Sequence, residues 1–303
     1  MNIVMYHYIR KQSVRHGQLN YLRDDEFEKQ LTFFEQNGGI VRIPSANSTG
    51  SETIKAEGSF LLSFDDGIID HLNIAKKLKA RGLLGIFGIT TKTVFEDFTP
   101  TTHLLHRLFA HNDPEVIYAN CNEYEKEMID VFSKKKLLDA SVYGLHREDS
   151  SFKLKLKTFV NYYSNRKAAR GLVEKLCQRL GVEISQDGLF LKKADIELIV
   201  KMGHLVIAHG HTHQNLRSLD KKDWQFEIKK SLEIIRYLGG DSSYYMFPFG
   251  GRKSFHDEHL NFLRDCGVIN AFTVDNLPAE DFLASPNLEI PRLDCKLYRT
   301  LGG

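Results

Sequence analysis

The sequence lacks the features that mark secreted, disulfide-bonded or membrane-spanning proteins. Its four cysteines (Cys121, Cys177, Cys266 and Cys295) are scattered and contain no CxxC pair, which is typical of reduced thiols in a cytoplasmic protein. No apolar run approaches the roughly 20 residues that span a bilayer. The amino-terminal stretch MNIVMYHYIRKQ has no basic lead followed by a long apolar segment. We therefore expect a cytoplasmic protein that is not transmembrane.

An excess of charge of one sign is also missing. The formal net charge is +2, which argues against nucleic acid or another polyanion as the partner. No internal repeat or low-complexity segment is visible. A hydrophobic content of 42% in 303 residues is sufficient for a full core in one large α/β domain or two smaller ones.

Strand-like and helix-like segments alternate along the chain. Short apolar segments predict strands at 2–9, 59–64, 83–90, 204–209, 244–250, 268–274 and 288–294. Helical spacing with capping and stop residues predicts helices at 24–39, 68–82 and 193–202, and near 220–238 and 254–265. This alternation favours a parallel sheet, either open and doubly wound or closed into a barrel.

One segment interrupts the alternation. Residues 98–190 have a mostly helical pattern, so we expect a single domain over 1–303 with a helical insertion at about 98–190. Within it, residues 152–170 mix six basic residues with aromatics. This mixture indicates either a site for phosphate or an anionic surface, or a solvated helix face, and the second interpretation is favoured.

Polar residues recur where the predicted strands end. In parallel α/β folds the carboxyl ends of the strands share one face, and sites assemble there. The residues at these positions are His7, Asp65, Asp66, His209, Asp275 and Arg292.

The segment AHGHTHQNL (208–216) supplies candidate metal ligands. His209 and His213 are four residues apart and follow an apolar strand, and Asp66 at another strand end offers an oxygen ligand. Two histidines and one carboxylate leave open positions on zinc or a similar ion, as a hydrolytic site requires. His211 is expected to point elsewhere. Asp65 then remains free to accept a proton from a water on the ion.

A structural explanation of the adjacent carboxylates stays open at this point. Both Asp65 and Asp66 precede the predicted helix at 68–82, and either could act as its N-cap. For an isolated Asp-Asp-Gly this would be the preferred interpretation, but the histidine motif favours the metal site.

These motifs resemble those of polysaccharide deacetylases, carbohydrate esterase family 4 of the NodB-homology type. SFDDG (63–67) is similar to the first motif, in which the first Asp is the base and the second binds the metal. HGHTH (209–213) is similar to the second, whose outer histidines are the other ligands. The resemblance covers about 59–97 and 191–294 and leaves the insertion outside. It implies a distorted (β/α)7-type barrel. FPFG is similar to the third motif, which forms a groove wall and implies substrate-binding roles for Phe247, Pro248, Phe249 and Gly250.

The chain departs from the family pattern at two places. Many members carry an Arg before the proline of the third motif, where Met246 and Phe247 stand here. The resemblance makes Arg292 the candidate to orient Asp65 in its stead, and a structural salt bridge explains Arg292 equally well. The carboxyl-terminal Leu-x-His that normally supplies the general acid is also absent after Arg292.

MYHYI (5–9) resembles the amino-terminal Tyr-His segment of poly-N-acetylglucosamine deacetylases, whose motif order is permuted. That resemblance implies that His7 is the general acid. A histidine packed within the first strand is the alternative.

The resemblance implies a metal-dependent hydrolase that removes an acetyl group, an N-acetyl in the first place, from an amino sugar or glycan precursor. Zn²⁺ is the expected cofactor, with Co²⁺, Ni²⁺ and Mn²⁺ as alternatives. A cytoplasmic location favours a nucleotide-linked or lipid-linked substrate. The alternatives are an O-deacetylase or formamide hydrolase on the same site, an inactive homologue that only binds glycan, and a scaffold with a structural metal. The oligomeric state does not follow from the sequence.

Overall fold

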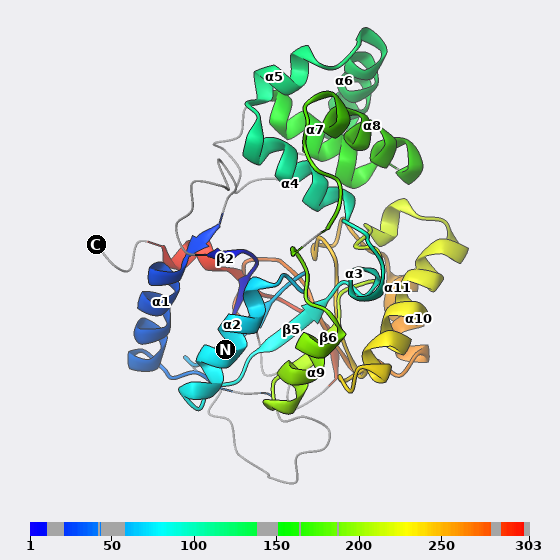
Figure 1. The fold of residues 1–303 in the computed structure, drawn as a ribbon. Helices are drawn as coiled ribbons and strands as arrows, with labels where there is room; N and C mark the ends of the chain where they lie inside the picture. Colours follow the sequence, from blue (N-terminus) through cyan, green and yellow to red (C-terminus); the bar gives the residue numbers. More distant parts are fainter. Residues whose placement is uncertain are drawn as a thin grey trace.

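The computed structural model describes residues 1–10, 21–41, 43, 58–137, 151–163, 165–186, 188–279 and 286–299. A sheet lies at its centre, with helices around it (Figure 1). The sheet has eight parallel strands in the order β10-β1-β4-β5-β6-β7-β8-β9. These strands are β1 (Asn2–Tyr6), β4 (Phe60–Phe64), β5 (Ile86–Ile89), β6 (Leu205–Ala208), β7 (Tyr244–Met246), β8 (Asn270–Phe272), β9 (Asn287–Ile290) and β10 (Leu293–Asp294). Two further short strands, β2 (Ile9–Arg10) and β3 (Leu22–Arg23), pair with each other.

The last predicted strand, 288–294, forms two short strands, β9 and β10, which lie at opposite edges of the sheet. β9 pairs with β8, whereas β10 pairs with β1 through the register Val4↔Leu293. Between them lie Pro291, which has no N–H for a strand ladder, and Arg292. The chain itself therefore connects one edge of the curled sheet to the other. This arrangement confirms the predicted distorted (β/α) barrel.

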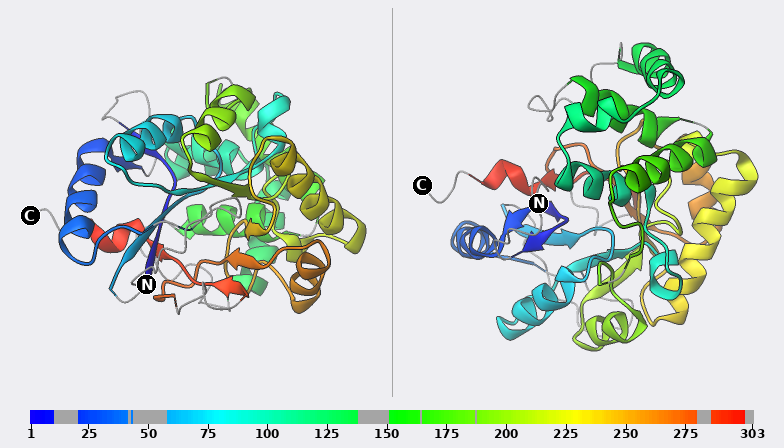
Figure 2. Two further views of the ribbon diagram at one scale, coloured as in Figure 1. Left: turned by 90° about the horizontal axis from the view of Figure 1, so that it is seen from below. Right: turned by 45° about the horizontal axis from the view of Figure 1, so that its top comes forward.

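Helices surround the outside of the sheet (Figure 2). They are α1 (Asp24–Gln36), α2 (Asp70–Ala80), α3 (Lys92–Phe95), α9 (Lys193–Lys201), α10 (Lys221–Tyr237) and α11 (Asp257–Asp265), and two 3₁₀ turns are η2 (Leu216–Ser218) and η3 (Cys295–Tyr298). None of the described helices is both long and apolar enough to cross a bilayer. The N-cap of α2 is Ile69, without a side-chain cap. The alternative that Asp65 or Asp66 caps this helix is therefore wrong.

Alternation along the strands separates two layers of the core. In β4, Leu62 and Phe64 pack with the surrounding helices, whereas Leu61 belongs to a cluster made almost entirely of strand residues on the inner face. β6 repeats the pattern, with Val206 on the helix side and Leu205 inside. Because side chains of a strand alternate between faces, the parity of each residue predicts its side of the barrel.

The segment between β5 and β6 is helical and has a hydrophobic core of its own. Its helices are α4 (Thr101–His111), α5 (Pro114–Ala119), α6 (Glu123–Leu137), α7 (Ser151–Tyr162) and α8 (Arg166–Arg179), which gather beside one end of the barrel (Figure 1). A separate cluster of buried side chains includes Leu104, Leu108, Phe159, Leu172 and Leu176. The inserted helices therefore pack around their own core, and α4 in addition contacts the barrel.

Cations of the basic stretch 152–170 have partners within the protein. Lys155 pairs with Asp130 at 2.8 Å, and Arg166 donates to Gln214 Oε1 at 2.6 Å. Arg170 donates to the carbonyl of Thr99 at 2.9 Å. These contacts give the cations structural roles and lend no support to an anion site.

A buried histidine at the start of β6 is expected to make stability depend on pH. His204 accepts a hydrogen bond from the Gly85 N–H at Nδ1 and donates from Nε2 to the Ala75 carbonyl, so it must be neutral. Burial lowers the pKa of His204 to about 4 from an ordinary 6.5. Neutral His204 therefore contributes fully to the free energy of unfolding above pH about 6.5. This contribution, at most about 3 kcal/mol, is lost as the pH falls toward about 4.

Urea unfolding of the parent and of His204→Gln, between pH about 7 and about 4.5, tests this prediction. The variant should be less stable at neutral pH and should lose less free energy of unfolding on acidification. Parallel pH dependences would show that His204 does not titrate in this range.

Candidate active site

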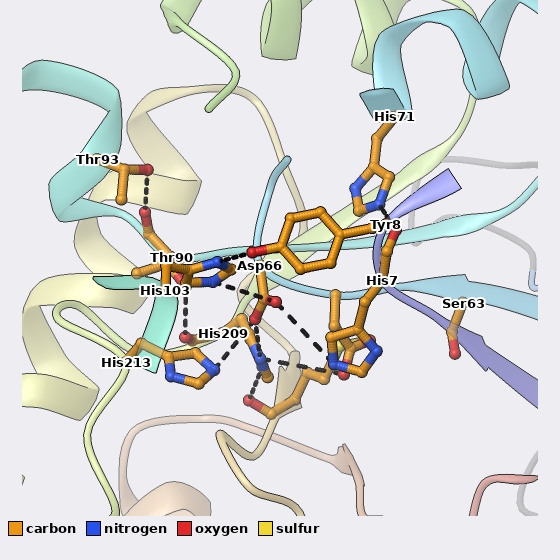
Figure 3. Close-up of polar contacts among 12 residues, drawn as sticks. His7, Tyr8, Ser63, Asp66, His71, Thr90, Thr93, His103, His209 and His213 are labelled. Carbon is orange, nitrogen blue, oxygen red and sulfur yellow. Dashed lines mark hydrogen bonds and ion pairs between the residues drawn. The ribbon is translucent and has the colours of Figure 1, made fainter. Parts of the chain in front are cut away.

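The polar residues at the strand ends continue the inward-facing rows of the barrel. Along β4 the inward positions run Leu61, Ser63 and then Asp65, because the side-chain period is two. By the same parity His209 follows the inward Leu205 and Ile207 of β6. The sequence therefore directs side chains from separate strands into one end of the barrel, and Figure 3 shows several of them converging.

Asp66, His209 and His213 form a compact set of potential ligand atoms. One atom from each lies within 4.8 Å of the others, and all three residues are buried. His209 Nε2 and His213 Nε2 are 3.2 and 3.1 Å from Asp66 Oδ1. Tetrahedral zinc bonds of about 2.0–2.1 Å place neighbouring ligands about 3.3–3.4 Å apart, so the spacing suits such an ion.

The hydrogen bonds of the set also fit a metal. His209 Nδ1 donates to the Met246 carbonyl at 3.0 Å, because a carbonyl can only accept. Its Nε2 is then unprotonated and faces Asp66, as a metal ligand must be. Asp66 Oδ1 is buried without a hydrogen-bond partner. Although burial opposes ionisation, the imidazoles of His103 and His213 hold the pKa of Asp66 well below its usual range.

The backbone at two of these residues is unusual. Asp66 has φ 78° and His213 has φ 57°, in the left-handed region that costs a non-glycine residue roughly 1–2 kcal/mol. Strained backbone of this kind clusters at functional sites, where the surrounding structure holds it in place.

Glu227 of α10 holds the histidine loop in place, and sequence analysis did not identify it. Its Oε2 accepts from the N–H groups of His211 and Thr212 at 3.0 and 2.8 Å, and its Oε1 accepts from the Thr212 hydroxyl. Glu227 therefore fixes the loop between His209 and His213 through these hydrogen bonds. The ring of His211 points away from the site and contacts Thr91 Oγ1 at 3.0 Å, in line with its predicted exclusion from the ligands.

Arg292 contacts Asp65 in the bidentate manner that favours a fixed carboxylate. Its guanidinium lies 2.6 and 2.9 Å from the two oxygens of Asp65, and both residues are buried. Nε of Arg292 donates to the Thr273 carbonyl at 3.0 Å, which orients the guanidinium plane. Burial raises the pKa of Asp65, yet Arg292 and then His209 outweigh it and lower the pKa overall. Asp65 is therefore ionised at neutral pH.

His7 lies at the rim of the same site. Its Nε2 is 4.0 Å from Asp66 Oδ2, and its side chain is 41% exposed. The backbone carbonyl of His7 accepts a hydrogen bond from Nε2 of the buried His71 at 2.8 Å. The structure thus places His7 beside the candidate metal ligands and leaves its imidazole accessible, rather than packed within the strand. Its role as a general acid stays a prediction.

The third motif presents only part of its surface to the site. Phe247 is buried and stacks on Phe255 with ring centroids 4.1 Å apart, and Pro248 is buried as well. Phe249 is half-buried, and its ring lies 5.0 Å from that of His213. At Gly250, with φ 57°, a Cβ would lie 2.3 Å from a side-chain carbon of Val274, so only glycine fits this turn. Among the four predicted substrate-binding residues, Phe249 is the one whose ring lies against a candidate metal ligand, and the substrate-binding roles stay predictions.

Sequence analysis also missed a histidine that the helical insertion brings to the site. His103, in the first turn of α4, is fully buried and has its Nε2 3.3 Å from Asp66 Oδ2 (Figure 3). Nothing in its sequence context, TTHLLHRLF, resembles the recognised motifs.

The fold is a distorted parallel barrel, and its strand ends carry a candidate Asp-His-His centre beside a second carboxylate. A family model described as polysaccharide deacetylase matches residues 153–271. The matched range contains the second and third motifs but not residues 59–97. It begins inside α7 and therefore includes part of the helical insertion, which was expected to lie outside the resemblance. No curated protein matches the chain.

Solved deacetylase structures share the fold. The chain is similar to the deacetylase PplD of Streptococcus pyogenes in complex with acetate (TM-score 0.55, 14% identity, 97% of this chain and 91% of that one). It is also similar to IcaB from Ammonifex degensii (TM-score 0.50, 14% identity, 96% and 90%). A de-N-acetylase from Aggregatibacter actinomycetemcomitans has a TM-score of 0.53, 11% identity and coverage of 96% and 93%. The predicted resemblance to polysaccharide deacetylases is confirmed by the family model and by the shared fold.

Proposed function

We propose that this chain is a metal-dependent hydrolase that removes an N-acetyl group from an amino-sugar carbohydrate. The observation that carries the proposal is that two adjacent carboxylates, Asp65 and Asp66, contact different partners. Asp66 faces His209 and His213 at ligand spacing, whereas Asp65 is held by Arg292 and remains ionised. A purely structural zinc site is usually closed by four protein ligands, and this set of three leaves a position for water or substrate.

A divalent ion held by Asp66, His209 and His213 would supply a Lewis acid that polarises the acetyl carbonyl and acidifies a water. Asp65 takes a proton from the attacking water, whose oxygen bonds to the acetyl carbon. The carbon–nitrogen bond then breaks, and protonated His7 supplies the proton that the leaving nitrogen needs. Water, an N-acetyl sugar and the two side chains thus yield acetate and a free amine.

Acetate release from a panel of N-acetyl, O-acetyl and N-formyl sugars tests the function, with the protein stripped of metal and then reloaded. We expect metal-dependent acetate from an N-acetyl substrate. Faster hydrolysis of the O-acetyl or N-formyl compounds would assign one of the alternative substrates. Binding of glycan without turnover would indicate an inactive homologue.

Removal of a ligand side chain is expected to remove the metal. Asp66→Ala, His209→Ala and His213→Ala should each lose most of the bound ion in elemental analysis. His211→Ala is the matched control, because His211 belongs to the same loop but its ring faces Thr91. It should keep the ion. Full occupancy in all three ligand variants would contradict the assignment.

We further propose Zn²⁺ as the ion, since the donor set of two imidazoles and one carboxylate suits it. The expectations of a cytoplasmic location and of a nucleotide-linked or lipid-linked substrate stay predictions. The intramolecular partners of Lys155, Arg166 and Arg170 give them no added support. Sugars with and without a diphosphate, compared in the acetate assay, test the second expectation.

A further inference from the structure

Asp66 presents its two oxygens to different groups. Oδ1 faces the Nε2 atoms of His209 and His213 at 3.2 and 3.1 Å. Oδ2 faces His103 Nε2 at 3.3 Å. His103 is not part of the compact set of ligand atoms formed by the other three residues. Its imidazole therefore lies on the outer side of the carboxylate.

The ring of His103 is held by groups on several sides. Its Nδ1 is 2.5 Å from the hydroxyl of Tyr8, and its ring lies edge-on to Phe190 with centroids 5.0 Å apart. The turn that carries it is anchored, since Arg170 donates to the Thr99 carbonyl. Nε2 is buried and has no hydrogen bond to any other described group. A fully buried imidazole nitrogen is thus aimed at the outer oxygen of a candidate ligand.

The proton positions follow from the partners. Asp66 is an acceptor only, so a favourable contact with Oδ2 requires a proton on His103 Nε2. A neutral imidazole then has a bare Nδ1, and the Tyr8 hydroxyl donates to it. The opposite tautomer would set the Nε2 lone pair against a carboxylate oxygen in a buried place, which is repulsive. In the favoured arrangement, the Tyr8 hydroxyl donates its proton to Nδ1 of His103, and the proton on Nε2 of His103 points at Oδ2 of Asp66.

We propose that His103 is a positioning residue that holds Oδ2 of Asp66 and thereby keeps Oδ1 directed at the two ligand histidines. The helical insertion contributes this residue, so the metal centre depends on the docking of α4 as well as on the barrel. The inference rests on the proposed function in one respect, that Asp66 binds the ion. Outer groups that orient a ligand typically contribute 10–100-fold to metal affinity.

Two substitutions of similar size separate this role from packing. His103→Gln places an amide N–H about where Nε2 lies, whereas His103→Asn places its nitrogen near the position of Nδ1 and cannot reach Asp66. Zn²⁺ affinity, measured by competition with a chromophoric chelator, is expected to fall about 10–100-fold in His103→Asn and His103→Ala. In His103→Gln it should stay within about threefold of the parent. Tyr8→Phe, which removes the donor to Nδ1, should give an intermediate loss.

The controls separate this inference from the proposed function. His106→Gln lies on the same helix and also contacts Tyr8, with Nδ1 3.5 Å from the hydroxyl, and it should bind Zn²⁺ as the parent does. Melting temperatures of the metal-free proteins report on packing. Equal Zn²⁺ affinity in the parent, His103→Asn and His103→Gln would overturn the inference while the parent still bound Zn²⁺ and released acetate. Equal losses in His103→Gln and His103→Asn would also overturn it. A parent that bound none of Zn²⁺, Co²⁺, Ni²⁺ and Mn²⁺ would overturn both proposals.

Discussion

Asp65→Asn is expected to lower kcat by about a hundredfold or more while the protein still binds its metal ion. Asparagine keeps the shape of the side chain but cannot accept the proton of the attacking water, and a general base contributes roughly 10²–10⁴-fold. The residue that would bind the ion, Asp66, is unchanged. The loss should therefore appear in kcat, with the metal content of the parent preserved.

Asp65→Asn is also expected to lower the free energy of unfolding, because it removes the negative partner of Arg292. The guanidinium of Arg292 is fully buried and makes two short contacts with the Asp65 carboxylate. Removing one partner of such a pair leaves an uncompensated charge and costs up to about 3–5 kcal/mol of stability. The kinetics must therefore be measured well below the melting temperature of the variant.

Asp70→Asn is the matched control for this experiment. Asp70 pairs with Arg10 at 2.7 Å and lies on the same segment, outside the candidate site. Its replacement should leave kcat near that of the parent. If kcat of Asp65→Asn stayed within about tenfold of the parent, equivalent to about 1.4 kcal/mol of barrier, Asp65 would not be the base.

His7→Ala is expected to separate amide from ester substrates. An amine leaves poorly until it is protonated, so loss of the general acid should cost about a hundredfold or more on an N-acetyl sugar. An activated acetyl ester has a leaving group that departs without a proton, and its hydrolysis should fall far less. The exposed imidazole near Asp66 Oδ2 gives His7 the position for this role.

His7→Gln distinguishes acid catalysis from hydrogen bonding. Glutamine can donate a hydrogen bond but cannot transfer a proton at neutral pH, so its loss on the N-acetyl substrate should match that of His7→Ala. Recovery of activity in His7→Gln would identify a binding role instead. Equal losses on amide and ester would point to packing or binding, and unchanged rates on both would remove His7 from the mechanism.

Much of the barrel could be predicted from the sequence, because its signals are local. Alternating apolar segments and helical spacing located the seven strand regions and five of the barrel helices to within a few residues, but not the short helix α3. The distorted barrel that the resemblance implied is also present, as a curled parallel sheet in which β10 lies beside β1. The sequence could not show that the last strand breaks at Pro291, because the break depends on which edge each half pairs with.

The candidate metal ligands were also accessible from the sequence. Asp66, His209 and His213 lie at strand ends that a parallel fold brings to one face, and their motifs have a recognisable spacing. Strand parity further explains why His209 points inward. These inferences need only the direction of a strand and the alternation of its side chains.

Other parts of the site depended on contacts that no local pattern specifies. The family resemblance named Arg292 as a candidate to orient Asp65, but the contact itself joins residues 227 positions apart and exists because the split last strand turns Arg292 into the barrel. Phe247 is buried and Phe249 is half-buried, and the left-handed backbone of Phe249 (φ 63°) accompanies this difference within the third motif.

By itself, the sequence of this protein determined the parallel barrel, the strand ends that carry polar residues, and the ligand types of the candidate centre. Only the tertiary structure decided that His103 of the helical insertion reaches Asp66 Oδ2. The direction of a helix side chain toward another element is set by how the whole helix packs. That packing is the sum of many weak apolar contacts spread over distant segments, so the sequence around His103 holds no local signal for it.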